Sequence, residues 1–340
     1  MSSFRISVII PSYRRPRDLS RCLAALAGQT RLADEICVVV REDDVESRQL
    51  LRANRAGLPG LRGVTVQRPG LVAAINQGLE AAAGDILIFT DDDAEATDQW
   101  VEAIERWFTT DARVGAVGGR DWIQLAEHDL NDPKPTTEIG QFGLFGRIGG
   151  NHHCPCPVRP LEVAVLKGVN MSFRRVALQN RRIDERLRGT GAQVGSEIDL
   201  CLPLRRRGWR VIFDASLTVK HYIAARSAGD DRLDFAGDVG RDAVYNIAYL
   251  IGKHGNVLQI AGSLLRGTFV GSRWTPGLLA LIKWRWKGDR DIIQRYRRQF
   301  GCIFSGTIDG IGQRYRGMME TGNEFPANSG RAATPPITGG

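Results

Sequence analysis

Short uninterrupted apolar runs alternate with amphipathic segments over the first hundred residues of the chain. Runs of this length, rich in Ile and Val, are typical of strands buried on both faces of a sheet. They occupy residues 6–10, 36–40, 64–67 and 86–89. Because helical segments separate them, they predict right-handed β-α-β units and a parallel, doubly wound α/β sheet.

Helical spacing fills the intervals between these runs. Leu19, Cys22, Leu23 and Leu26 fall at i, i+3, i+4 and i+7, on one face of a helix, and Gly28 follows as a stop signal. The same reasoning predicts further helices at 45–53, 72–79, 99–108 and 198–207.

The pattern weakens past residue 113, and the organisation of the chain changes there. Residues 114–160 are rich in Gly and Pro, 161–173 are strand-like around Gly168, and 211–213 form a further apolar run. Amphipathic helical patterns return at 236–317. We expect a main domain at 1–225 with halves of about 1–113 and 114–225, a basic helical extension at 226–317, and a disordered tail at 318–340.

Charge sets the helical extension apart from the rest of the chain. The net charge is +8, yet residues 241–317 alone carry a balance of +9, so the remainder is close to neutral. Trp274, Trp284 and Trp286 lie among these basic residues, a composition typical of a membrane interface. We therefore expect an anionic membrane surface as a partner. A solvated helix face above core tryptophans is the alternative.

Targeting signals are not evident in the sequence. The chain shows no signal peptide and no uncharged apolar segment of 18 residues, and its six cysteines have no disulfide-like spacing. These features predict a cytoplasmic, reducing setting, with attachment at the inner face of the cell membrane.

Three consecutive carboxylates, Asp91, Asp92 and Asp93, follow directly on the apolar run at 86–89. The carboxyl ends of strands in α/β sheets form the ligand crevice, and hard divalent ions take oxygen ligands there, often with substrate phosphates. The alternative is that one Asp caps the helix expected at 99–108. A cap needs one Asp, whereas this strand ends in three, so we favour a metal and phosphate site.

A series of motifs resembles those of inverting family 2 glycosyltransferases with the GT-A fold. In chain order they are Val8-Ile9-Ile10-Pro11-Ser12-Tyr13 with Arg15; Asn76-x-Gly78; Phe89-x-Asp91-Asp92-Asp93; Gly168-Val169-Asn170-Met171; Glu197-Ile198-Asp199-Leu200; Gly208-Trp209; and His221. The likeness covers about residues 4–223. It implies a mostly parallel sheet flanked by helices, with a nucleotide-binding half before about residue 113 and an acceptor half after it.

The resemblance also implies a divalent metal, Mg²⁺ or Mn²⁺, that bridges the phosphates of a nucleotide-sugar donor. Asp91 and Asp93 match the family's D-x-D pair, in which the first Asp lies near the ribose and the last binds the metal. His221 stands where several relatives place a third ligand. A lone His is more often structural, and that alternative stays open.

Glu197 falls where the family carries its catalytic Asp, so the resemblance implies that its carboxylate takes the proton of the acceptor hydroxyl. The residue before it, usually Glu, is Ser196. Ser196 and Asp199 also match a capping box that would open a helix, which is the structural alternative. Because Pro203 removes a backbone hydrogen bond, we expect this helix to be kinked or to start later.

The donor itself is implied to contact a larger set, Pro11, Tyr13, Arg15, Asp43, Arg68, Asn76, Asp91, Asp92, Gly168 and Asn170. Val40 and Arg41 stand where the family has its base-binding Asp, so Asp43 is expected to serve from a shifted position. Ile75 stands where relatives often carry Arg, which makes Arg68 the candidate for a phosphate contact.

The expected activity is metal-dependent transfer of a sugar to a saccharide or lipid-linked acceptor, in cell-surface polysaccharide or glycolipid synthesis. One alternative is a nucleotidyltransferase, which would carry a Gly-rich basic loop where this chain has residues 11–15. Another is a protein that binds nucleic acid or an anionic surface without catalysis, which would leave the acidic cluster unexplained. We do not expect nucleic acid as a partner.

Overall fold

The computed structural model describes residues 4–124, 133–158, 160–223, 237–271, 276–279, 281 and 292–321. Within these residues the strands form one mixed sheet in the order β3-β2-β1-β4-β8-β6-β9-β5, and β7 pairs with β9. The strands are β1 (Ile6–Ser12), β2 (Glu35–Arg41), β3 (Leu61–Val66), β4 (Ile86–Phe89), β5 (Ala94–Ala96), β6 (Val114–Gln124), β7 (Leu161–Glu162), β8 (Met171–Arg174) and β9 (Arg210–Tyr222).

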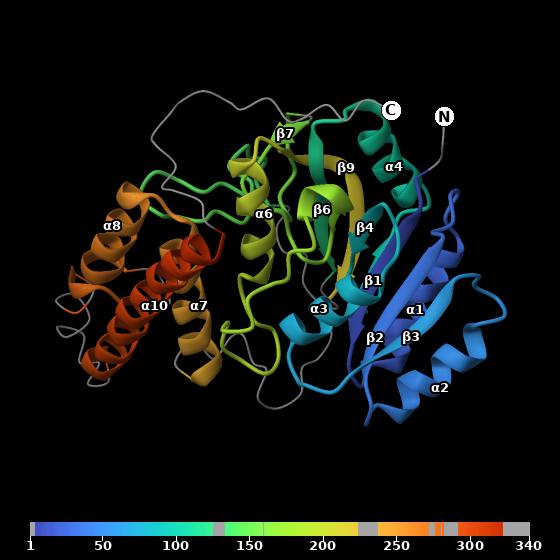
Figure 1. Cartoon of the computed structure of the whole chain (residues 1–340), viewed down its shortest axis with the longest axis horizontal. Coiled ribbons are helices and arrows are strands. Elements are labelled where there is room, and N and C mark those ends of the chain that lie inside the picture. Colours follow the sequence, from blue (N-terminus) through green and yellow to red (C-terminus); the bar gives the residue numbers. More distant parts are fainter. Residues whose placement is uncertain are drawn as a thin grey trace.

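Helices cover both faces of this sheet, and a group of C-terminal helices gathers at one end of the molecule beside α6 (Figure 1). The helices are α1 (Pro16–Ala27), α2 (Val45–Asn54), α3 (Leu71–Ala81), α4 (Trp100–Thr110), α5 (Arg175–Leu178), α6 (Ser196–Arg206), α7 (Asp238–His254), α8 (Val257–Leu265), the π-helix η1 (Arg266–Val270) and α10 (Ile292–Thr321).

The first four strands are parallel, as the apolar runs predict. β1 pairs with β2 and with β4, and β2 pairs with β3, all in the parallel sense. β8 then runs antiparallel between β4 and β6, while β6 and β9 are parallel to each other. Because β1 and β4 are parallel and Ile9 lies beside Phe89, the residues that follow both strands meet at one edge of the sheet.

Alternating side chains of the central strands divide the core into two layers. Ile36, Val38 and Val40 of β2 pack with α1, α2 and α4, whereas Cys37 and Val39 pack with α3, α6 and α7. This is the period of two that a strand buried on both faces requires. Both layers are apolar, so the parallel strands are sealed from solvent on each side.

Local sequence explains where several helices begin and how closely they pack. Pro16 stands in the first turn of α1, where its missing N–H costs nothing. Asp44 caps α2 by accepting a hydrogen bond from the backbone N–H of Ser47 at 3.2 Å. Gly78 lets α3 approach β1, since a Cβ at this position would lie 2.4 Å from Ile9 Cγ2.

Three predictions for the second half of the chain need correction. The strand expected over 161–173 is wrong, because only β7 and β8 are strands and the residues between them form a turn-rich connection. The short strand at 211–213 is part of β9, which is 13 residues long. A later start for the helix that contains Pro203 is also wrong, because α6 begins at Ser196 and continues through Pro203.

α7 shares the core of the sheet although it belongs to the predicted extension. Tyr245, Tyr249 and Leu250 are buried in the same cluster as the inner side chains of β4, β8 and β9. α10 packs along α7, and its Gly306 and Gly310 lie against the backbone of Tyr245 and Tyr249. The division at 225 into two domains stays a prediction.

The C-terminal helices bear on the membrane prediction only in part. Measured against the length and hydropathy that a bilayer span requires, every helix in the described part of the chain falls short. The basic segment with Trp274, Trp284 and Trp286 lies outside the described residues, as does the predicted tail beyond Thr321.

Candidate active site

The acidic cluster lies at the edge of the sheet where β4 ends, and the end of β9 lies beside it. β5 follows the cluster and pairs with β9 so that Ala94 lies beside His221. Candidate ligand atoms of Asp91, Asp93 and His221 therefore all lie within 4.8 Å of one another. The three residues that the sequence singled out as metal ligands come together, from positions up to 130 residues apart in the chain.

The sequence did not indicate a fourth residue of this cluster, Asp121. His221 lies between two buried carboxylates, with Nδ1 2.9 Å from Asp121 Oδ1 and Nε2 3.2 Å from Asp93 Oδ1. Burial disfavours the charged imidazole, but Asp121 and Asp93 outweigh it and raise the pKa of His221 to about 10. Only the parallel register of β6 and β9, which no local pattern reveals, places Asp121 there.

The donor set of this cluster fits a divalent metal. Carboxylate oxygens suit Mg²⁺ and Mn²⁺, and an imidazole favours a transition ion such as Mn²⁺ over Mg²⁺. An imidazole whose Nδ1–H is held by Asp121 directs Nε2 toward Asp93, which is the orientation of a metal-bound histidine with a carboxylate behind it. Asp91, Asp93 and His221 would hold the ion.

Asp92, the middle carboxylate, points instead toward the end of β1. The Ser12 hydroxyl donates to Asp92 Oδ2 at 2.8 Å, and Arg15 Nη1 lies 3.3 Å from Asp92 Oδ1 and 3.4 Å from Asp93 Oδ2. Burial together with the neighbouring Asp93 and Asp91 raises the pKa of Asp92 to about 7, against the opposing effect of Arg15 and Ser12. Arg15 thus offsets part of the negative charge of the cluster.

The helix-capping alternative for these aspartates is wrong. β5 intervenes between the cluster and α4, whose N-cap is Gln99 with no side-chain hydrogen bond. The three carboxylates therefore belong to the edge of the sheet.

Tyr13 and Asp43 form a second part of the site, at the ends of β1 and β2. The Tyr13 hydroxyl donates to Asp43 Oδ2 at 3.1 Å, and Arg14 pairs with the same carboxylate at 3.1 Å. The guanidinium groups of Arg14 and Arg41 lie 5.0 and 5.1 Å from the centroid of the Tyr13 ring. The structure thus places Asp43 beside the loop of Tyr13, and its role in binding a base stays a prediction.

Glu197 and Asp91 line the same cavity, of about 90 Å³. The lining comes from the ends of β1 and β4, from Leu71 and Ile75 of α3, and from residues 167–169 and 192–197. Gly195, with a φ of 92°, gives the chain the left-handed turn from which α6 starts. This turn brings Glu197 to the cavity two residues later.

The capping-box alternative for Ser196 and Asp199 is wrong. The N-cap of α6 is Gly195, which has no side chain to cap with, and Ser196 is already inside the helix. The Ser196 hydroxyl lies 3.5 Å from Glu197 Oε2. The side chain of Asp199 is buried between α6 and α7, where it bonds to Lys253 and His254.

Three further predicted donor contacts have other partners in the structure. The Asn170 side chain accepts from Trp100 Nε1 at 3.0 Å and donates to Leu217 O at 2.8 Å, so it ties α4 to β9. Asn76 exchanges two hydrogen bonds with the backbone of Ile183, and Arg68 pairs with Glu185 at 2.6 Å. Their contact with a donor stays a prediction.

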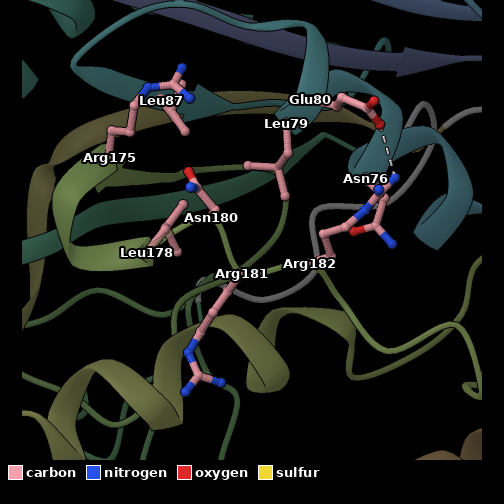
Figure 2. Close-up of a pocket in the computed structure, with 9 residues that line it drawn as sticks. All are labelled: Asn76, Leu79, Glu80, Leu87, Arg175, Leu178, Asn180, Arg181 and Arg182. Atoms are coloured by element: carbon pink, nitrogen blue, oxygen red, sulfur yellow. Dashed lines mark ion pairs between the residues drawn. The ribbon is translucent and has the colours of Figure 1, made fainter. Parts of the chain in front are cut away.

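A larger cavity, of about 310 Å³, lies at the opposite end of α3 (Figure 2). Leu79, Leu87 and Leu178 line it, together with an ion pair between Arg182 and Glu80 at 3.2 Å. Figure 2 shows Arg181 directed away from Leu79 and Leu87. Of these two cavities, the smaller one is the candidate active site, because Asp91 and Glu197 line it.

Comparison with known proteins agrees with this geometry. Residues 7–165 match the model of the family described as glycosyl transferase family 2. Glycosyltransferase AglE of Haloferax volcanii is 31% identical over 100 residues, which are 28% of this chain and 33% of AglE. The chain thus matches about a third of the length of that relative.

Two solved structures show the same fold. TarS of S. aureus, crystallised with UDP-GlcNAc, has a TM-score of 0.57 at 15% identity, over 94% of this chain and 93% of the TarS fragment. GalNAc-T7, crystallised with UDP, GalNAc and Mn²⁺, has a TM-score of 0.59 at 14% identity, over 84% of this chain and 54% of that one. Both are glycosyltransferases with the GT-A fold.

Proposed function

Since the chain belongs to glycosyltransferase family 2 and has the GT-A fold, we propose that it transfers a sugar from a nucleotide-sugar donor to an acceptor hydroxyl, with inversion at the anomeric carbon. The observation that carries the proposal is the cavity shared by Asp91 and Glu197. Asp91 brings one carboxylate of the acidic cluster to this cavity, for the side of a diphosphate, and Glu197 brings a carboxylate for proton transfer.

The reaction is a single displacement. The acceptor oxygen forms a bond to the anomeric carbon while the bond from that carbon to the diphosphate oxygen breaks, and Glu197 takes the proton that the acceptor hydroxyl loses. Asp91, Asp93 and His221 would hold a divalent ion, which would supply positive charge for the departing diphosphate. Arg15, paired with Asp92 and Asp93, keeps these carboxylates in place.

The nucleoside end of the donor fits the groups near the ends of β1 and β2. Tyr13 is 38% exposed, so its ring offers a surface on which a base can stack. Asp43, which accepts a hydrogen bond from the Tyr13 hydroxyl, is the candidate partner for the polar edge of such a base. UDP-GlcNAc is bound by TarS, and UDP with Mn²⁺ by GalNAc-T7, which supports a nucleoside diphosphate as the leaving group here.

Replacing the proposed base tests the proposal. Glu197→Gln keeps the shape of the side chain but cannot take a proton, so turnover should fall about 10²- to 10⁴-fold while the donor still binds. Release of nucleoside diphosphate measures turnover, and calorimetry measures donor binding. Glu102→Gln, a change of an exposed acid on α4, is the control and should keep its turnover. Near-normal turnover of the Glu197 variant would contradict the assignment.

We also propose that the acceptor is a saccharide or lipid-linked saccharide at an anionic membrane surface, in polysaccharide or glycolipid synthesis. α10 supports the membrane part. Exposed apolar side chains follow one face of it, namely Ile293, Phe300, Phe304, Ile308, Tyr315 and Met319. Phe300 stacks on Tyr296 and on Phe304. Exposed Arg297, Arg298 and Arg316 accompany this face, and basic residues around an apolar stripe suit an anionic bilayer.

Flotation with lipid vesicles tests the attachment. The protein should float with vesicles that contain phosphatidylglycerol and much less with pure phosphatidylcholine. Phe304→Ser should weaken the partition about tenfold or more, because burying a Phe side chain contributes about 1.5–3 kcal/mol. Val176→Ser is the matched control, since Val176 is 66% exposed on α5. Equal flotation of both variants would contradict a role of α10.

A further inference from the structure

Asp199, two residues after Glu197, is the centre of a buried ionic cluster with the end of α7. Lys253 Nζ lies 2.9 Å from Asp199 Oδ1, and His254 Nε2 donates to the same oxygen at 2.5 Å. The backbone N–H of Asp184 donates to Asp199 Oδ2 at 2.8 Å. The side chain of Asp199 is only 3% exposed, so each of these partners is needed to compensate its charge.

Asp184 extends the cluster along α7. Its carboxylate accepts from the Tyr249 hydroxyl at 2.5 Å and pairs with Lys253 Nζ at 3.0 Å. Tyr249 and Lys253 are one helical turn apart, so they present their polar ends on the same face of α7. One ammonium group thus holds both the segment that begins at Ile183 and helix α6.

Hydrogen bonds between side chains and backbone hold the segment between Asp184 and Glu197 at further points. Asn246 of α7 accepts from the backbone N–H of Arg188 at 2.7 Å and donates to its carbonyl at 2.9 Å. Gln193 accepts from the backbone N–H of Val72 at 2.9 Å and donates to Leu187 O at 2.6 Å. α7 on one side and α3 on the other therefore fix the segment that carries Glu197 to the cavity.

A charged cluster in this place calls for an explanation beyond stability. Apolar residues of similar volume often stabilise a core as well as a buried ion pair does, whereas ionic and hydrogen-bonded partners define one geometry. Here that geometry concerns the first turn of α6, where Glu197 faces the cavity and Asp199 faces α7. A shift of α7 would move both residues together.

We propose that Asp199, with Lys253 and His254 of α7, is a positioning residue that holds Glu197 in place, an inference that rests on the base role proposed for Glu197. α7 would then support the active site through α6, without lining the cavity. A misplacement of about 1 Å can cost about 10²-fold in rate, so loss of the cluster should lower kcat far more than it lowers donor affinity.

Lys253→Met tests the proposal, because it removes the shared ammonium and keeps the apolar stem. We expect kcat to fall about 10- to 100-fold and the dissociation constant of the donor to change by less than about threefold. Hydrogen exchange of amides 183–197 should accelerate. Lys253→Arg, which restores the charge, should recover most of the kcat. Tyr249→Phe is a milder variant that removes only the hydroxyl at Asp184, and a smaller fall is expected.

Arg62→Met is the matched control. Arg62 Nη2 pairs with Glu35 Oε1 at 2.7 Å, and the Glu35 side chain is only 8% exposed, so this variant also strips a buried carboxylate of its cation, but at the far edge of the sheet. It should lower the melting temperature without the selective loss of kcat. Equal kcat values for Lys253→Met and Arg62→Met would overturn the proposal. If Glu197→Gln is inactive at the same time, the proposed function stands and only the positioning role fails.

Discussion

At the scale of single residues, the main feature of the site is a group of neighbouring carboxylates and the cations that pair with them. Asp91, Asp92, Asp93 and Asp121 lie close together, and within the described residues Arg15 and His221 pair with three of these carboxylates. Burial, and after it the neighbouring Asp93 and Asp91, raise the pKa of Asp92 although Arg15 and Ser12 oppose the shift. Under the proposed function, a divalent ion would offset negative charge at this cluster and would lie between the carboxylates and a diphosphate.

Asp121 should raise the affinity of the site for a metal through its hydrogen bond to His221, without contacting the metal. Asp121→Asn keeps a hydrogen bond to Nδ1 of His221 but removes the negative charge behind the ring, so Mn²⁺ should bind about 10- to 100-fold more weakly. Titration of free Mn²⁺ by electron paramagnetic resonance measures this directly, without turnover. Asp214→Asn, on the same strand as His221 but bonded to Trp107, serves as the control. Identical Mn²⁺ affinity in wild type and Asp121→Asn would contradict the role of Asp121.

The residues that could be predicted from the sequence are those whose chemistry is visible in a short stretch. Three adjacent Asp residues after a strand indicate a ligand site wherever the rest of the chain lies. Asp121 stands alone in its stretch, and it gains its role from His221, which is 100 residues away in sequence. Asp199 shows the opposite case, since its local pattern predicts a cap and its true partners lie on α7.

At the scale of elements, the apolar runs predicted β1, β2 and β4. Strands that are buried on both faces are continuously apolar, so their own sequence is enough to identify them. β9 was predicted only over its first residues. Its later part alternates buried and more exposed positions along β6, with a register shift between Gly119 and Arg120. Long-range register of this kind is fixed by packing and not by local periodicity.

At the scale of the whole molecule, the C-terminal helices have two faces with different roles. α7 enters the core of the sheet and bonds to α6, which bears Glu197. α10 packs on α7 through glycines and presents apolar side chains outward. Net charge indicated that this region is distinct. It could not indicate that the first helix of the region contacts α6, because that contact depends on neutral and buried groups as much as on basic ones.

Calorimetric titration of nucleoside diphosphates tests the central claim most directly. We expect UDP or GDP to bind the wild-type protein in the presence of Mn²⁺ and to bind much more weakly in chelator, because the acidic cluster repels the diphosphate unless a cation lies between them. Asp93→Asn should lose most of the Mn²⁺ effect. If the wild-type protein binds the nucleotide equally well in Mn²⁺ and in chelator, the acidic edge is not the diphosphate site and the proposed enzyme mechanism is wrong.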